Sequence, residues 1–149
     1  ANNTLGEEGT KFICEAVKSN TTIKELDLSG GMSGNIGGAA GAKHVADMLN
    51  VTASLTVADL RFNNLDTESA TALAAVAKEK QISLCGIKPE QTEANFQGET
   101  FKRMGPADAI LLTADLAVRT SVTSVRAFGN SWSSGSDGVS AHFPCLLCR

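Results

Sequence analysis

The sequence lacks long apolar runs and long runs of one charge. No apolar run comes near the roughly 18 residues that a membrane-spanning helix needs. Thirteen Lys and Arg stand against 16 Asp and Glu, which gives a net charge of −3, and no block of like charge is longer than two residues. This balance does not favour nucleic acid or an anionic membrane as a partner. We therefore expect a soluble protein without a membrane span.

The chain also lacks the features of a secretory leader. It begins at Ala1, with neither a basic lead nor an apolar segment behind it. This start indicates a processed form, an expressed piece or a fragment of a longer protein. We expect an intracellular, cytoplasmic location, with an organelle reached after N-terminal processing as the alternative.

Against these absences stands one apolar pattern that recurs. Its two clearest copies are Leu55, Ala58, Leu60, Asn63, Leu65 and Val122, Val125, Ala127, Asn130, Trp132. A third copy, Ile23, Leu26, Leu28 and Ile36, has a longer turn. The copies lie roughly thirty residues apart, with one longer interval. Recurrence of one supersecondary unit predicts a solenoid, because each unit has an apolar face that only a neighbour can bury.

Each unit combines a short strand with a helix. The strands are expected at about 24–28, 56–60, 92–96 and 123–127. The helices are expected at about 7–18, 39–49, 67–78 and 106–118, and in the first of them Phe12, Ile13, Ala16 and Val17 form the apolar stripe. Alternating strands and helices predict an α/β protein with parallel strands and right-handed crossovers. Because helices are wider than strands, the strands are expected on the concave side and the helices on the convex side.

This pattern resembles the leucine-rich repeat family, and the period near thirty with a full helix per unit is similar to its ribonuclease-inhibitor-like subtype. The resemblance covers 1–132, about four repeats, and leaves 133–149 as an irregular C-terminal tail. It implies a horseshoe segment, and a non-catalytic scaffold that binds proteins through its concave face.

Three features depart from the family pattern. Gly34 and Lys102 stand where the bend Asn is expected. In the family that side chain bonds backbone groups along the stack, so each loss is expected to cost on the order of 1 kcal/mol unless another group substitutes for it. A segment near 81–91 is additional to the repeat, and we interpret it as an inserted turn before the strand at 92–96.

The sequence contains no complete motif for a cofactor or a catalytic site. The glycine-rich segment 34–44 has Ala42 and His44 where a phosphate loop needs Gly and Ser or Thr, and we expect no nucleotide. Cys145 and Cys148, with His142 before them, have the spacing of half a zinc site, which Cys85 alone could extend. We expect no metal, no cofactor and no catalytic residue, with a metal protein or enzyme using these three tail residues as the competing hypothesis.

The concave strand face is the candidate binding surface. Alternate strand residues point to opposite sides, so the residues between the inward ones face a partner. They are Glu25, Asp27, Val57, Asp59, Arg61, Glu93, Asn95, Ser124 and Arg126. Stacking is expected to align Asp27, Asp59, Asn95 and Arg126 in one row. Two neighbouring carboxylates repel each other, and either Arg61 or Arg126 relieves them or a basic partner does.

We therefore expect a non-catalytic interaction scaffold that binds a protein partner, one with basic groups, through the concave face and adjoining loops. The alternative is a structural subunit built permanently into a larger multi-protein assembly. No nucleic acid and no small-molecule substrate is expected. Fold alone says little about the task of such a protein.

Overall fold

Helices and strands alternate along the chain in the computed structural model, which describes residues 3–31, 33–97 and 103–127. In chain order the elements are α1 (Gly6–Lys18), β1 (Glu25–Asp27), α2 (Gly38–Val51), β2 (Val57–Asp59), α3 (Thr67–Lys80), β3 (Glu93–Asn95), α4 (Pro106–Val118) and β4 (Ser124–Arg126). The predicted positions of the strands and helices are thus confirmed to within a few residues.

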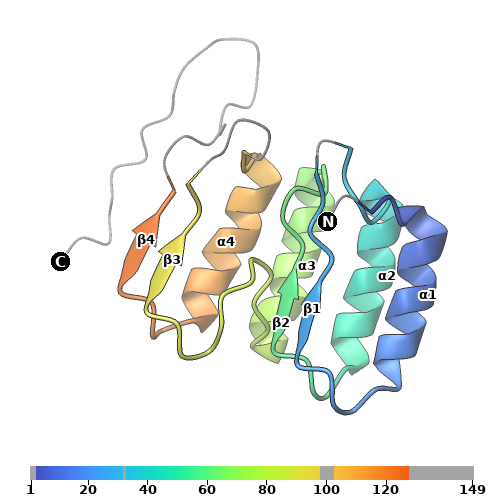
Figure 1. Cartoon of the computed structure of the whole chain (residues 1–149), viewed down its shortest axis with the longest axis horizontal. Helices are drawn as coiled ribbons and strands as arrows, with labels where there is room; N and C mark the ends of the chain where they lie inside the picture. The colour runs from blue at the N-terminus through green and yellow to red at the C-terminus, as the bar shows by residue number, and fades with distance from the viewer. Residues whose placement is uncertain (1–2, 32, 98–102, 128–149) are drawn as a thin grey trace, which may run out of the picture.

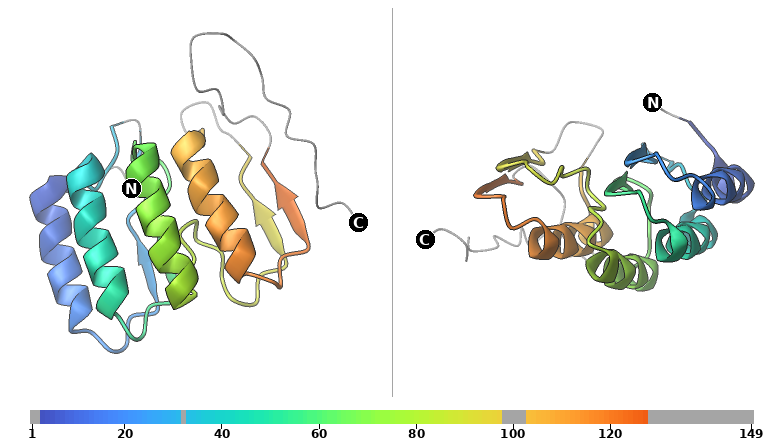
Figure 2. Two further views of the ribbon diagram at one scale, coloured as in Figure 1. Left: turned by 180° about the vertical axis from the view of Figure 1, so that it is seen from behind. Right: turned by 90° about the horizontal axis from the view of Figure 1, so that it is seen from below.

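The elements lie in two layers. The four helices of the described residues stand side by side in one layer, and the strands form a second layer that faces one side of the helices (Figures 1 and 2). Each helix packs against the next one, α1 on α2, α2 on α3 and α3 on α4. All the strand-to-strand pairing within the described residues is parallel.

The predicted leucine-rich-repeat solenoid is wrong. The described strands form two separate two-stranded sheets, β1 with β2 and β3 with β4, and no continuous sheet runs along a horseshoe. In the first sheet Leu26 pairs with Ala58, and in the second Ala94 pairs with Val125. The two sheets do not pair with each other, so the strands present two short faces instead of one concave surface.

The inserted segment explains the break between the sheets. Ser83 forms a parallel bridge with Val57, so the segment lies along the free edge of β2. The backbone carbonyl of Ser83 accepts from Ala58 at 2.7 Å, and that of Leu84 accepts from Leu60 at 2.9 Å. These bonds use the edge that β3 needs for pairing. The segment near 81–91 is therefore more than a turn: it replaces β3 as the neighbour of β2.

Helix α4 fixes this segment with a buried carboxylate. Asp115 is fully buried, and its oxygens accept from the backbone amides of Leu84 at 2.6 Å and Cys85 at 2.9 Å. The Ser83 hydroxyl donates to the same carboxylate at 2.5 Å. Burial raises the pKa of the Asp115 carboxyl above its ordinary value, although the hydrogen bonds from Leu84, Ser83 and Cys85 lower it.

A buried arginine one turn later adds three more bonds. The Arg119 guanidinium donates to the backbone carbonyls of Ile87 at 3.0 Å, Gln81 at 3.2 Å and Thr56 at 2.6 Å. These carbonyls belong to the beginning and the middle of the inserted segment and to the residue before β2. Charged groups with such partners can be buried, because their hydrogen bonds replace those lost with water.

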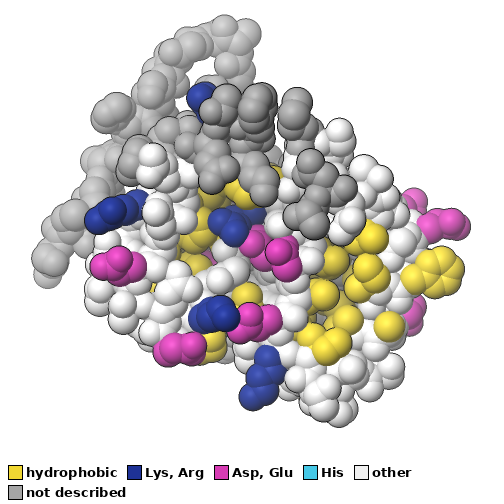
Figure 3. All heavy atoms as spheres, viewed as in Figure 1, with side chains coloured by type: hydrophobic (Ala, Val, Ile, Leu, Met, Phe, Trp, Pro, Cys, Tyr) yellow, Lys and Arg dark blue, Asp and Glu magenta, His cyan; other side chains and the backbone are white. Residues whose placement is uncertain are grey.

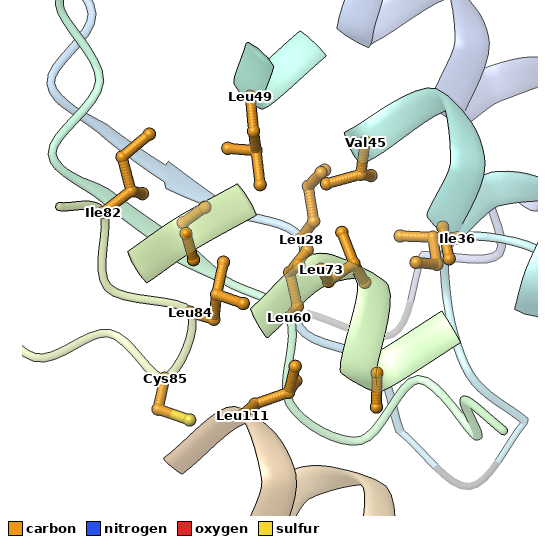
Figure 4. Close-up of a cluster of buried hydrophobic side chains, with 14 of the residues drawn as sticks. Leu28, Ile36, Val45, Leu49, Leu60, Leu73, Ile82, Leu84, Cys85 and Leu111 are labelled. Carbon is orange, nitrogen blue, oxygen red and sulfur yellow. The ribbon is translucent and has the colours of Figure 1, made fainter. Parts of the chain in front are cut away.

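The core lies between the two layers and takes side chains from both. Leu28 and Leu60 follow β1 and β2, Val45 and Leu49 come from α2, and Leu73 comes from α3 (Figure 4). Each of these is at most 2% exposed. The inserted segment contributes Ile82, Leu84 and Cys85, and α4 contributes Leu111. The insertion is therefore part of the core.

The apolar stripe of α1 differs from the prediction. The buried residues of α1 are Thr10, Cys14 and Val17, whereas Phe12 is 72% exposed. The predicted stripe is wrong at Phe12 and Ala16, which are exposed, and is confirmed at Val17, which is buried, and at Ile13, which is partly buried against the core. Helix α1 packs on α2, and the Phe12 ring lies on the outside.

Another side chain substitutes for the bend Asn that is missing at Gly34. Asn35, the next residue, is 6% exposed and its amide oxygen accepts from the backbone of Leu5 at 3.2 Å. Its amide nitrogen donates to the carbonyl of Leu28 at 3.3 Å. Asn35 thus does what was expected of an Asn at position 34. Lys102 lies outside the described residues, as do Asn130, Trp132 and the tail at 133–149.

Candidate functional site

The predicted binding residues lie on the strand face but are divided between the two sheets. The register pairs Glu25 with Val57 and Asp27 with Asp59 in the first sheet. In the second sheet it pairs Glu93 with Ser124 and Asn95 with Arg126. The predicted single row of Asp27, Asp59, Asn95 and Arg126 is wrong, because the inserted segment stands where β2 and β3 were expected to pair.

Two of the predicted binding residues are buried. Val57 is 5% exposed and Asp59 is 8% exposed. Gly86 of the inserted segment lies against the Asp59 carboxylate, since a Cβ at Gly86 would stand 3.1 Å from Oδ2. Gly86 also has φ +78°, a conformation that favours glycine. The side chains of Val57 and Asp59 therefore lie beneath the strand face and are not available to a partner.

Arg61 neutralises the carboxylate of Asp59. Its Nε lies 2.9 and 3.1 Å from the two carboxylate oxygens, and one terminal nitrogen lies 2.5 Å from Oδ2. The backbone amide of Arg61 also donates to Asp59 at 3.1 Å. A planar guanidinium suits this two-oxygen contact better than an ammonium group. The expected repulsion between Asp27 and Asp59 is thus relieved within the protein, as one of the two sequence hypotheses stated.

Two aromatic rings hold the same guanidinium. Its central carbon lies 5.5 Å from the ring centre of Phe62 and 5.3 Å from that of Phe96. Both distances are within the range of a cation–π contact. Phe62 follows β2 and Phe96 follows β3, so Arg61 connects the two sheets on the strand side. Alternation along the strand predicted Arg61 on this face, but no pattern in the sequence indicated either ring.

A second buried carboxylate supports Phe62. Asp108, in the first turn of α4, accepts from the backbone amide of Phe62 at 3.0 Å and from that of Gly105 at 2.9 Å. Phe62 has φ +63°, which is uncommon for an aromatic residue. Burial raises the pKa of the Asp108 carboxyl. The sequence gave no signal for this contact, because its partners are far apart in the chain.

Asp27 remains as an exposed acid beside this cluster. Its carboxylate accepts from the backbone amide of Ser29 at 2.9 Å. Partial burial raises the pKa of Asp27, but the hydrogen bonds from Ser29 and the charge of Arg61 outweigh it, so that the pKa falls below its ordinary value. Asp27 is therefore charged at neutral pH and accessible.

The other face residues carry charge of both signs. Glu25 contacts Lys88 of the inserted segment, with Oε1 and Nζ 3.0 Å apart. Glu93, Asn95 and Arg126 are exposed on the second sheet. In Figure 3 basic and acidic side chains alternate across the middle of this face, and apolar side chains gather to one side of it, over β1 and α1. An exposed surface of mixed charge is typical of the rim of a protein interface.

The glycine-rich segment before α2, which the sequence did not favour as a nucleotide site, packs within the protein. The Ile36 carbonyl accepts from Thr10, and a Cβ at Gly37 would stand 2.4 Å from the backbone nitrogen of Glu7. His44 is half-buried, and its Nε2 lies 3.7 Å from Glu7 Oε1.

Among residues 3–31, 33–97 and 103–127, no three His, Cys, Asp or Glu side chains gather as a metal site would require. Cys14 and Cys85 are both buried, and burial raises the pKa of the Cys14 thiol to about 11. The metal hypothesis for His142, Cys145 and Cys148 falls outside the described residues. No helix in the described part is long and apolar enough to cross a bilayer.

Comparison with known proteins adds little. No protein-family model and no curated protein matches the chain. The chain is similar to a solved structure titled "Leiomodin-1 Actin-Binding Site 2 (ABS2)". The match covers 85% of this chain and 68% of the other chain, with 18% sequence identity and a TM-score of 0.49. A likeness of this size carries no argument about function. Membership of the leucine-rich repeat family stays a prediction.

Proposed function

We propose that this protein is a non-catalytic binding module that holds a protein partner against its strand face. The observation that supports this proposal most is the Arg61 side chain, fixed by Asp59 and bracketed by Phe62 and Phe96. Arginine and aromatic residues that are already ordered make strong contact points, because little conformational freedom is lost on binding.

The support under Arg61 makes it a rigid platform. Asp59 and Asp108 are each 8% exposed and bond the backbone or side chain of the Arg61–Phe62 pair. Two elements distant in the chain, β2 and α4, thus fix one half-buried cation and one ring. Besides connecting the two sheets, such preorganisation suits a contact surface.

The partner that suits this face presents a basic side chain. Asp27 is exposed and charged, while Asp59 is already neutralised by Arg61. Burial lowers the pKa of the Arg61 guanidinium, but the nearby charges of Asp59 and Asp27 both raise it, so both carboxylates act on Arg61. Two carboxylates around one guanidinium leave a net negative charge, which attracts Lys or Arg from a partner.

Affinity capture with matched variants tests this proposal. The full chain is used to isolate a partner, and binding is then measured for the Asp27→Lys variant and for Glu79→Lys on the helix side, where Glu79 is exposed near the end of α3. We expect Asp27→Lys to weaken binding roughly tenfold or more, because it puts like charges together. Glu79→Lys should bind as the native chain does.

Equal affinities of both variants would contradict the proposed face. The salt dependence separates the alternative function from this one. A partner held by Asp27 dissociates more readily as ionic strength rises, since exposed charges are screened. A subunit built permanently into an assembly would instead stay bound at high salt and aggregate when isolated.

A further inference from the structure

The two ends of the described structure are open in the same way. At one end, α2 is the one described element on which α1 packs, and β1 pairs on one edge with β2. At the other, α4 packs on α3, and β4 pairs on one edge with β3. Within the described residues the outer edges of β1 and β4 pair with no other strand. An unpaired strand edge is a template for pairing with another chain.

Both ends expose apolar side chains. At the first end Phe12 is 72% exposed, and Leu5, Ile13, Ile23 and Leu26 extend the core to the surface while only partly buried. Figure 3 shows apolar side chains gathered on the side of the molecule where β1 and α1 lie. At the opposite end Val125 is 39% exposed. A gathered apolar patch such as the one at the first end is typical of a contact site.

The internal register shows how one end fits the other. In both sheets the middle residues pair, Leu26 with Ala58 and Ala94 with Val125. A shift of one residue would turn the inward side chains to the opposite face, so the same register is favoured for any further parallel strand. A β1 strand placed beside β4 of another copy therefore sets Leu26 opposite Val125.

Charge favours the same arrangement. With Leu26 opposite Val125, the next position sets Asp27 of one copy opposite Arg126 of the other. Both side chains are exposed in the structure. Residues opposite each other on neighbouring strands lie close enough for charges to interact, and opposite charges stabilise the pair.

We propose that a second copy of this chain docks end to end, with its β1 edge and α1 on the β4 edge and α4 of the first. The contact joins two different surfaces, so it leaves an open end on each side and extends to longer chains of copies. The interaction uses the strand edges, and it needs no other partner.

Sedimentation velocity of the full chain over a concentration series tests the docking. The native chain is expected to form dimers and longer species as its concentration rises. Asp27→Arg sets two arginines against each other at this contact, and Arg126→Asp sets two aspartates against each other, so each variant alone should associate at least tenfold more weakly. The double variant, Asp27→Arg with Arg126→Asp, restores opposite charges and should associate as the native chain does.

Mixing the two single variants gives the sharpest outcome. Wherever the two kinds of chain meet, positions 27 and 126 carry opposite charges, whichever chain supplies β1, so association should return on mixing. A native chain that stays monomeric at every concentration, or single variants that gain nothing on mixing, would overturn the proposal. Circular dichroism of each variant confirms that it is folded. Because no partner is present, these results do not bear on the proposed function.

Discussion

At the scale of single residues, Asn63 has the largest structural role that the sequence pattern indicated. It is 2% exposed, and its amide oxygen accepts from the backbone of Asn35 at 2.7 Å and Ile36 at 3.1 Å. Its amide nitrogen donates to the carbonyls of Leu28 and Leu60, each at 2.9 Å. One side chain thus satisfies four backbone groups from two successive turns.

Truncation of this side chain should destabilise the protein strongly. Asn63→Ala leaves buried backbone groups without partners, and we expect the free energy of unfolding to fall by about 3 kcal/mol or more. Urea denaturation of the full chain measures it. Asn50→Ala, at an exposed position of α2, is the control and should change stability little. A loss below about 1 kcal/mol for Asn63→Ala would show that water replaces these bonds.

The sequence identified Asn63 but not Asn35, and the reason is geometric. The pattern assumes a bend residue two positions before the next apolar residue, and that position is Gly34. The longer turn, with Gly34 at φ +72°, brings the next residue to the same place. Spacing alone does not reveal such a shift, because it depends on backbone angles that the glycines permit.

Asp115 provides a pH-dependent test at the residue scale. Burial raises the pKa of this carboxyl in the folded protein above its ordinary value of 3.8. The folded state therefore binds the proton more tightly than the unfolded chain, and this group adds stability as the pH falls from neutral toward 3.8. At neutral pH that contribution is absent.

Comparison with Asp115→Asn isolates this contribution, since the variant keeps the shape and removes the titration. We expect the native chain to gain stability relative to the variant as the pH falls from about 7 to about 4. Parallel pH profiles for the two proteins would contradict the raised pKa. Asp27, whose pKa is lowered, acts in the opposite direction and only near and below 3.8, where its stabilising charge is lost.

At the scale of elements, the inserted segment decides the architecture. The sequence indicated an inserted turn here, but not that the segment takes the place of β3 beside β2. That outcome depends on Asp115 and Arg119, which lie some thirty residues away in the chain. The sequence therefore predicted the positions of individual elements well and their pairing poorly, because pairing is decided by contacts between distant residues.

Loss of Arg119 should loosen this segment and leave the rest in place. Arg119→Ala removes three hydrogen bonds to Gln81, Ile87 and Thr56. Amide hydrogen exchange should rise at Leu84, Cys85 and Ile87, while protection in α1 and α2 stays close to native. Uniformly faster exchange along the whole chain would instead show that the segment and the helices open together.

At the scale of the whole molecule, the core is expected to unfold as one unit. Cys14 lies in α1 and Cys85 lies in the inserted segment, and both are buried. In a variant with Cys145→Ser and Cys148→Ser, neither remaining thiol should react with a disulfide reagent under native conditions at mildly alkaline pH. Both should react together when urea unfolds the chain. Release of Cys85 at a lower urea concentration than Cys14 would show that the insertion unfolds separately.

The candidate surface was only partly predictable at this scale. Alternation along the strands placed Asp27, Glu93 and Arg126 on an exposed face, because side-chain direction follows from strand geometry. Burial of Val57 and Asp59 was missed, since it comes from Gly86 and its neighbours. The Phe62 and Phe96 rings around Arg61 were missed for the same reason: tertiary packing brings them together.

The central claim, that a partner covers the strand face, is tested most directly by carboxylate footprinting. The full chain, alone and with its captured partner, is labelled with carbodiimide and glycine ethyl ester, and modification is located by mass spectrometry. We predict that the partner lowers labelling of Asp27 and Glu93 and leaves Glu68 and Glu79 on α3 unchanged. Protection of the α3 carboxylates with full labelling of Asp27 would contradict it.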